Sequence, residues 1–334
     1  MNRYFDLTPE QQRTTITQTA IRLGLPEQAV EKDLWVTTIL QLVFTLPFAD
    51  KLVFKGGTSL SKSFGLIQRF SEDIDLVVDR SLFDLYGDLT KKQIKTLRKK
   101  SSLFVRDDFV RILKDAIVSA GLERHCDIVP EPDGEGDGTY PEPRKIDVYY
   151  KSLFPLNKYL QPKVMLEVGA RSLFDPTVDT SIASLISTQF SQIETSIAPS
   201  PAITTAAPEK TFLEKAFLLH ELFTTGRAES AESKSRHLYD LERMMGESFA
   251  QQAINNDLLW TTIAHHREVF TSLSAVDYTP DIRDRIVLCP PLHVRSVWAK
   301  DYADMQRSMI YGTSLSFDAL LERIEALEGL FHNR

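Results

Sequence analysis

The sequence predicts an α+β fold, with a sheet and flanking helices in the first part of the chain and a helical bundle behind it. Short apolar runs typical of strands recur among helical segments up to residue 171, whereas apolar residues after residue 210 follow helical spacing. Between the two parts, residues 196–210 are rich in Ser, Pro, Ala and Thr, a composition typical of a boundary. We therefore expect two domains, residues 1–200 and residues 201–334.

The composition, with 43% hydrophobic and 25% charged residues, is that of a soluble globular protein. A net charge of −7 argues against a general polyanion binder, although a local basic face can still bind nucleic acid. Cys126 and Cys289 lie far apart without metal-ligand spacing, so we expect both to be reduced and structural. The start has no apolar leader and no segment is apolar enough to span a membrane, so we expect a cytoplasmic protein without a membrane partner.

The chain is expected to start with two helices. Thr8 is a good N-cap, Pro9 suits the first helical position and Gln11 completes a capping box. An apolar stripe that starts near Val30 predicts a second helix, which Pro47 stops.

The next segments alternate between strand and helix. A strand at 51–55 is followed by the turn Gly56–Gly57, a short helix at 58–65 and a strand at 74–78, and residues 89–121 are expected to be helical. Residues 131–145 form a turn-rich loop whose glycines lack a phosphate-binding spacing, so we interpret it as a hairpin loop. Two β-like runs follow, around Asp147 and around Glu167. The last helix places six apolar residues on one face: Phe317, Leu320, Leu321, Ile324, Leu327 and Phe331.

The stretch from Gly56 to Asp75 carries the clearest chemical signal. Alternate residues of a strand share a face, so Asp73 and Asp75 project together, and two adjacent carboxylates repel each other unless a cation lies between them. Mg²⁺ commonly binds one or two carboxylates together with substrate phosphates. Glycines let backbone N–H groups approach a phosphate at the start of a helix, where Thr58 and Ser59 add hydroxyl donors. These parts together predict a nucleoside triphosphate site with a metal clamp.

Each part also has a simpler interpretation. Two aspartates near the start of a strand can be solvated turn residues, and two consecutive glycines can be a tight turn alone. The ordered set of strand, Gly-Gly-Thr, helix, Asp-x-Asp and apolar strand favours the triphosphate site.

The same residues resemble a known family. The pattern of Gly-Gly-Thr followed by Asp-x-Asp is similar to the signature of the DNA polymerase β-like nucleotidyltransferase superfamily. The longer string VFKGGTSLSKSFGLIQRFSEDIDL, residues 53–76, resembles the AbiEii/AbiGii-type nucleotidyltransferase toxins of type IV toxin–antitoxin systems. Further stretches resemble the same family in the same order along the chain: VEKDLWVTTIL at 30–40, KTFLEKAFLLHEL at 210–222, SRHLYDLERM at 235–244, KDYADMQRSMIYG at 300–312 and SFDALLERI at 316–324.

The resemblance implies a mixed sheet of the polymerase β-like type and a metal site built on strand carboxylates. Asp73 and Asp75 match the first pair of metal ligands, and the third is expected on a neighbouring strand. Glu167 in VMLEVGAR and Asp147 in KIDVYY both fit, and Glu167 is preferred because its surroundings resemble the family strand. The implied cofactor is Mg²⁺ or Mn²⁺, and the implied substrate is a nucleoside triphosphate held by Gly56, Gly57 and neighbouring residues.

Three residues outside the paired aspartates also match family positions. Lys215 matches a lysine that contacts the triphosphate, and its alternative is an ordinary surface lysine. Asp240 matches an aspartate that orients Lys215 or an attacking hydroxyl, and its alternative is a surface carboxylate paired with Arg236 or Arg243. Ser71 is expected to touch phosphate, to cap the turn into the strand or to be modified so that its negative charge blocks the pocket.

Two other clusters have both a functional and an ordinary interpretation. His265 and His266 lack a second ligand pair at metal spacing, so we assign them to a helix and not to zinc. A basic helix either contacts an RNA backbone or is a solvated face. Its six basic residues are Lys91, Lys92, Lys95, Arg98, Lys99 and Lys100.

The resemblance implies a metal-dependent transfer of a nucleotide to RNA, with the 3′ end of tRNA as the expected acceptor. It also implies a toxin linked to phage defence and a cognate winged-helix antitoxin of AbiEi type. Three alternatives stay open: transfer to a protein or small molecule, a non-catalytic nucleotide-binding regulator, and a phosphotransferase that uses the same triphosphate clamp.

Overall fold

The computed structural model describes residues 2–71, 73–155, 161–195, 200–229 and 231–333. The chain forms two compact units: the first unit comprises Met1–Ser63 and Glu72–Thr205, and the second comprises Phe64–Ser71 and Ala206–Arg334. Residues 64–71, between the glycine turn and the paired aspartates, thus belong to the second unit. Of the segment 196–210 that was expected to mark a boundary, residues 196–199 lie outside the described residues.

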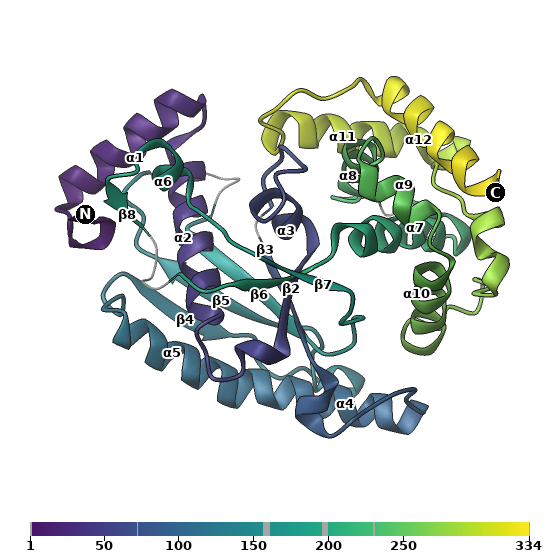
Figure 1. Cartoon of the computed structure of the whole chain (residues 1–334), viewed down its shortest axis with the longest axis horizontal. Coiled ribbons are helices and arrows are strands. Elements are labelled where there is room, and N and C mark those ends of the chain that lie inside the picture. The colour runs from purple at the N-terminus through teal and green to yellow at the C-terminus, as the bar shows by residue number, and fades with distance from the viewer. Residues whose placement is uncertain (1, 72, 156–160, 196–199, 230, 334) are drawn as a thin grey trace. The chain divides into compact units, whose positions relative to one another are not determined.

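The first unit contains a mixed sheet, which confirms the predicted α+β class (Figure 1). Its strand order is β4-β5-β6-β3-β2-β9-β7. β3 is parallel to β6 and β2 is parallel to β9, whereas β2–β3, β4–β5 and β5–β6 are antiparallel. The strands are β2 (Leu52–Lys55), β3 (Asp73–Val78), β4 (Cys126–Pro130), β5 (Arg144–Tyr150), β6 (Lys163–Gly169), β7 (Thr177–Thr180) and β9 (Ile203–Ala206). The short strands β1 (Asn2–Arg3) and β8 (Ile193–Glu194) form a separate parallel pair.

The first unit also contains the predicted N-terminal and basic helices. Its helices are η1 (Tyr4–Asp6), α1 (Pro9–Leu23), α2 (Glu27–Val43), η2 (Ala49–Lys51), α3 (Gly56–Lys62), η3 (Arg80–Phe83), α4 (Lys91–Phe104), η4 (Val105–Phe109), α5 (Val110–Ser119), η5 (Gly136–Gly138) and α6 (Leu185–Gln189). The Gln11 amide N–H donates to the Thr8 hydroxyl at 3.3 Å, and the Thr8 amide donates to the Gln11 side chain at 3.0 Å. This capping box confirms the predicted start of α1.

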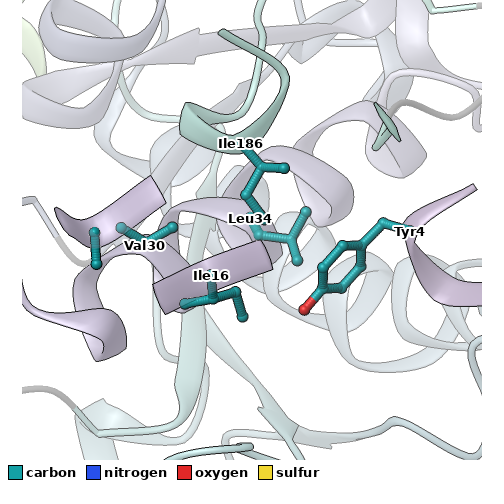
Figure 2. Close-up of a cluster of buried hydrophobic side chains, with 6 residues drawn as sticks. Tyr4, Ile16, Val30, Leu34 and Ile186 are labelled. Atoms are coloured by element: carbon teal, nitrogen blue, oxygen red, sulfur yellow. The ribbon is translucent and has the colours of Figure 1, made fainter. Parts of the chain in front are cut away.

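The N-terminal helices pack through a buried apolar cluster (Figure 2). Figure 2 shows how Ile16 of α1, Val30 and Leu34 of α2 and Ile186 of α6 lie together with Tyr4. Burial of such side chains contributes about 1.5–3 kcal/mol each and fixes α1 and α6 on α2. Because α2 in turn packs on β6 and α5, it connects the N-terminal helices to the sheet.

The described part of the second unit is helical, as the sequence predicts. Its helices are α7 (Pro208–Thr224), α8 (Arg236–Met244), α9 (Ser248–Ile254), α10 (Asp257–Phe270), η6 (Pro280–Arg285), η7 (Leu292–Val294), α11 (Arg295–Ser308) and α12 (Phe317–His332). Five of the six apolar residues predicted on one face of the last helix are buried: Leu320, Leu321, Ile324, Leu327 and Phe331. Among the helices described in both units, none is long and apolar enough to cross a membrane.

Segment 64–71 is held in the second unit by the residues that follow α11. The Phe70 amide donates to the Met309 carbonyl at 2.8 Å, and the Tyr311 amide donates to the Gln68 carbonyl at 3.1 Å. The Phe70 and Tyr311 rings lie 4.9 Å apart. The short helix predicted at 58–65 is α3, which begins at Gly56 and ends at Lys62. The chain then leaves the first unit and returns to it before β3 begins.

Candidate active site

Asp73 and Asp75 share one face of β3, as the alternation predicts. Both are partly exposed, whereas Ile74 and Leu76 between and after them are buried. In the parallel pairing of β3 with β6, Asp75 lies opposite Glu167. Side chains at paired positions of neighbouring strands project to the same face, so Glu167 shares the face of Asp73 and Asp75. Asp147 lies on this face too, because it and Asp73 are both paired with Met165.

The register distinguishes the two candidates for the third carboxylate. Glu167 is on β6, directly beside β3, whereas Asp147 is on β5, one strand further away. The Asp147 carboxylate accepts hydrogen bonds from the Lys163 ammonium at 2.9 Å and the Tyr149 hydroxyl at 3.1 Å. Glu167 makes a looser ion pair at 3.4 Å with Lys145, whose side chain is 47% exposed, and such exposed pairs contribute little. The geometry therefore favours Glu167 over Asp147 as the third carboxylate beside Asp73 and Asp75.

The donor set suits a hard divalent cation. Carboxylate oxygens are the ligands that Mg²⁺ and Mn²⁺ take in proteins, and Asp73, Asp75 and Glu167 supply them from one face. In the described part of the chain, no group of three or more His, Cys, Asp or Glu side chains is already arranged around a metal position.

Gly56 brings the first turn of α3 against the Asp75 carboxylate. Its φ of +81° lies in the left-handed region, and a Cβ atom at this position would be 2.0 Å from Asp75 Oδ2. Both the backbone conformation and the close approach therefore require glycine here. The backbone N–H groups of the first turn of a helix have no partners within the helix, so this turn keeps donors for a phosphate next to Asp75.

Replacing Gly56 with Ala is expected to displace Asp75 and to abolish activity. The left-handed backbone alone costs about 1–2 kcal/mol for a residue with a Cβ, and the clash with the carboxylate adds to it. Gly24→Ala is the matched control, because Gly24 has a φ of +65° and nothing within 4 Å of an added Cβ. Urea unfolding and a transfer assay on both variants measure the difference. Equal stability and activity in the two variants would show that the contact with Asp75 is unimportant.

Thr58 and Ser59 are both buried, and their hydroxyl groups are already used within the chain. The Thr58 hydroxyl donates to the Asp73 carbonyl at 2.5 Å, and the Ser59 hydroxyl donates to the Gly56 carbonyl at 2.8 Å. These bonds join α3 to the start of β3 and fix the glycine turn. In this arrangement the two hydroxyl groups are used to hold the glycine turn, which leaves the backbone amides as the donors available to an anion.

The second unit contains a buried ion cluster around Asp240. The Lys215 ammonium on α7 lies 2.8 Å from one Asp240 oxygen. Arg69 donates from Nε and from Nη2 to the two Asp240 oxygens, each at 2.7 Å. Asp240 is fully buried and Arg69 is 2% exposed, so the alternative of a surface carboxylate paired with Arg236 or Arg243 is wrong.

The two cations keep Asp240 ionised. Burial alone would raise the pKa of its carboxyl, but the attraction of Arg69 and then of Lys215 outweighs burial and holds the pKa well below its usual range. Burial lowers the pKa of Lys215, and repulsion from Arg69 adds to this effect despite the attraction of Asp240. The cluster therefore carries one excess positive charge when all three groups are ionised, with Lys215 8% exposed at its edge.

Arg69 is the residue of this cluster that sequence reasoning missed. It lies in segment 64–71, and α8 binds this segment through two adjacent side chains. The Tyr239 hydroxyl accepts a hydrogen bond from the Gln68 amide at 3.3 Å, next to the pair of Arg69 with Asp240. The signal in the sequence is an arginine four residues before Asp73 in a chain whose family aspartate needs a buried partner.

The other residues predicted for the site lie in several places. Ser71 is partly buried at the end of segment 64–71. On α4, Arg98 Nε donates to the Tyr140 carbonyl at 2.7 Å and Lys100 Nζ donates to the Phe83 carbonyl at 3.0 Å. Lys99 lies over the Tyr140 ring. Lys91, Lys92 and Lys95 are exposed, and among the described residues their ammonium groups make no hydrogen bond or ion pair.

The two cysteines are free thiols in the described chain. Burial, with some repulsion from nearby carboxylates, raises the pKa of Cys126 to about 11 and that of Cys289 to about 12. Thiols with such pKa values are poor nucleophiles near neutral pH, which agrees with a structural role.

Acidification is expected to destabilise the protein in part through His220 on α7. Burial, together with repulsion from Arg285, lowers the pKa of His220 below its ordinary value of 6.5, and its Nδ1 accepts a hydrogen bond from the Val287 amide at 3.1 Å. Below pH 6.5 the unfolded chain therefore binds more protons than the folded chain, so this contribution is full above pH 6.5 and declines as the pH falls. Urea unfolding between pH 5 and 7 should show a smaller pH dependence in His220→Asn, and an unchanged slope would contradict the assignment.

Comparison with known proteins identifies first the class and then the family. The fold is that of a nucleotidyltransferase: MenT4, a nucleotidyltransferase toxin from Mycobacterium tuberculosis H37Rv, matches with a TM-score of 0.52 and 15% identity, over 98% of this chain and 90% of that one. The family of nucleotidyl transferase AbiEii toxins of type IV toxin–antitoxin systems matches residues 39–323. The chain belongs to this AbiEii family. No curated protein matches the sequence. Membership makes the chain a nucleotidyltransferase toxin and implies a cognate antitoxin as its partner.

Proposed function

We propose that the protein transfers a nucleotide from a nucleoside triphosphate to an RNA acceptor, with the 3′ end of tRNA as the target. The observation that carries the proposal is the placement of Asp73 and Asp75 on one face of β3, with Asp75 against the glycine turn of α3. This places two anionic ligands beside backbone donors. Such a pair suits a metal-bound triphosphate, because a cation removes the repulsion between the two carboxylates.

Asp73, Asp75 and Glu167 would hold Mg²⁺ or Mn²⁺. When bound, the cation supplies charge neutralisation for the phosphates and lowers the pKa of the acceptor hydroxyl. The amides of Gly56 and Gly57 would bind the triphosphate, and Thr58 and Ser59 hold these amides in place through their own bonds. Lys215, oriented by Asp240, would supply positive charge to the departing pyrophosphate.

The reaction is a substitution at phosphorus. The acceptor hydroxyl oxygen forms a bond to the α-phosphorus, the bond from the α-phosphorus to the bridging oxygen breaks, and pyrophosphate leaves with that electron pair. The hydroxyl proton passes to solvent or to a carboxylate of the site. A phosphotransferase would instead form a bond to the γ-phosphorus and release a nucleoside diphosphate.

The exposed lysines at the start of α4 support RNA as the acceptor. RNA phosphates are bound by clustered Lys and Arg, and Lys91, Lys92 and Lys95 are solvated side chains on adjoining turns. Arg98, Lys99 and Lys100 are engaged in contacts within the chain and contribute less.

Changing Lys91, Lys92 and Lys95 together to Gln should weaken RNA use at least about tenfold in kcat/KM and reduce its salt dependence by roughly two in log–log slope. The matched control changes the exposed lysines Lys114, Lys151 and Lys300 to Gln. Steady-state transfer measured at several salt concentrations gives both quantities. If the acceptor is a protein or a small molecule, the α4 variant will behave like the control.

The test of the proposed function uses each of the four α-labelled nucleoside triphosphates with Mg²⁺ and total cellular RNA. Label in an RNA band of tRNA size supports the proposal. Label on protein supports the alternative of transfer to a protein. Growth arrest that persists in an inactive Asp73 variant would support a non-catalytic regulator. The proposal further includes neutralisation by a winged-helix antitoxin and a part in phage defence, which co-expression and phage challenge would test.

A further inference from the structure

A second candidate site is a pocket of about 310 Å³ that lies within the second unit. It is formed by one side of α7, the loop after α7, the start of α8 and the end of α10. The paired aspartates are not part of it, and neither are the residues of the buried ion cluster. Its volume is at the small end of the range for ligand sites, which suits one nucleotide unit and not a folded macromolecule.

Positive side chains dominate the pocket. Arg227, Lys234, Arg236 and Arg267 line it, against two carboxylates. One of these, Glu221, is neutralised by Arg267, with Arg267 Nε 2.6 Å from Glu221 Oε1, and it also accepts from the Tyr278 hydroxyl at 2.7 Å. The other charged residues of the lining are the cations Arg227, Lys234 and Arg236 and the carboxylate Glu232.

Two of these cations have no partner in the described chain. Arg227 is exposed and Arg236 is partly buried, and neither makes an ion pair or a hydrogen bond through its guanidinium among the described residues. A guanidinium on the wall of a pocket without a carboxylate partner is well suited to a phosphate, because its fork of N–H groups matches two phosphate oxygens.

His237 adds a neutral polar group to the same pocket. Its Nδ1 is buried and has no hydrogen-bond partner among the described residues. Burial lowers the pKa of His237 well below its ordinary value, and repulsion from Lys215 and Arg236 lowers it further, so the ring is neutral near pH 7. A neutral imidazole has one N–H donor and one acceptor nitrogen, and a buried nitrogen without a partner costs stability until it finds one.

The loop that shapes the pocket is fixed by Asp301. The Asp301 carboxylate accepts from the amides of Ser233 and Ser235 at 2.7 and 2.9 Å, and from the Ser235 hydroxyl. The backbone amides at the start of α8 are therefore already bound to the Asp301 carboxylate. A further anion in the pocket would have to be bound by the side chains that line the pocket. Leu218, Leu222 and Leu273 supply apolar surface for a sugar or base.

We propose that this pocket binds the phosphate group of a nucleotide unit, with Arg227 and Arg236 as its charged ligands and His237 as a neutral hydrogen-bonding group. The unit comes either from a free nucleotide or from a strand of bound RNA. Because binding is measured without turnover, a failure of this proposal and a failure of the proposed transfer reaction are distinguishable.

The test uses the full chain labelled with ¹⁵N at histidine and follows the ring signals by NMR during titration. The probes are inorganic phosphate, AMP and a single-stranded RNA tetranucleotide. The signal absent from His237→Asn is that of His237, and it should shift saturably. Arg227→Gln should weaken the binding at least about tenfold, since hydrogen bonds to charged groups contribute that much. Arg307→Gln, which changes an exposed arginine outside the pocket, should leave it unchanged.

The outcomes separate the sources of the phosphate. Tight binding of AMP indicates a free nucleotide, and tight binding of the tetranucleotide alone indicates an RNA strand. The proposal is overturned if no probe shifts the His237 signal saturably, or if Arg227→Gln and Arg307→Gln bind equally well. Because Arg227 is exposed, its variant should fold normally, and a thermal melt verifies this.

Discussion

Asp73→Asn and Asp75→Asn are each expected to lower kcat for nucleotide transfer at least about 100-fold, because each removes a proposed ligand of a cation that would contribute several kcal/mol to the transition state. The amide keeps the size of the side chain, so β3 should pair as before. Stability should be equal or higher without metal, since the change removes repulsion between two carboxylates on one face. Transfer assays and thermal melts with and without Mg²⁺ measure the two effects.

The control for this prediction is Asp127→Asn on β4. Asp127 is an exposed carboxylate on the edge strand of the same sheet, two strands away from β6 and three away from β3 in the strand order. It should retain activity and Mg²⁺ dependence. An Asp73→Asn variant that keeps more than half of the activity would remove the aspartate pair from the mechanism.

Asp240→Asn is expected to destabilise the protein by about 3–5 kcal/mol, because it leaves Arg69 and Lys215 buried without their counter-charge. Urea unfolding monitored in the second unit measures this loss. Asp304→Asn is the matched control: Asp304 pairs with Arg307 on the exposed surface of α11, and such a pair contributes about 0–1 kcal/mol.

A triple variant separates structure from catalysis in this cluster. Arg69→Met, Lys215→Met and Asp240→Leu together replace the charges with apolar side chains of similar size, which often restores stability. The triple variant should be more stable than Asp240→Asn and still inactive, because Lys215 is lost. If Asp240→Asn is as stable as Asp304→Asn, the ion cluster does not hold the second unit together.

The sequence predicted the parts of the fold that local chemistry determines. The capping box of Thr8 and Gln11 marks the start of α1 because its partners are three residues apart, and the alternation around Ile74 sets the faces of β3. The edge strand β7 escaped prediction because TVDT is short and polar. Its pattern does not differ from that of a loop.

In the candidate site, too, the sequence predicted the residues that lie close together along the chain and missed one whose partner is distant. The Asp-x-Asp pair and Gly56 are close in sequence, so strand and turn geometry place them together. Arg69 could not be assigned because its partner Asp240 lies 171 residues away and only the folded chain brings them within 2.7 Å. The unit to which segment 64–71 belongs also depends on long-range pairing, with Met309 and Tyr311.

The most direct measurement compares two labels on the nucleoside triphosphate that the protein accepts. Purified protein is incubated with Mg²⁺ and RNA and with the triphosphate labelled at either the α- or the γ-phosphorus, beside the Asp73→Asn variant. The account predicts that α-label enters RNA, that γ-label appears in pyrophosphate, and that the variant does neither. Transfer of γ-label to RNA, or full α-transfer by Asp73→Asn, would contradict it.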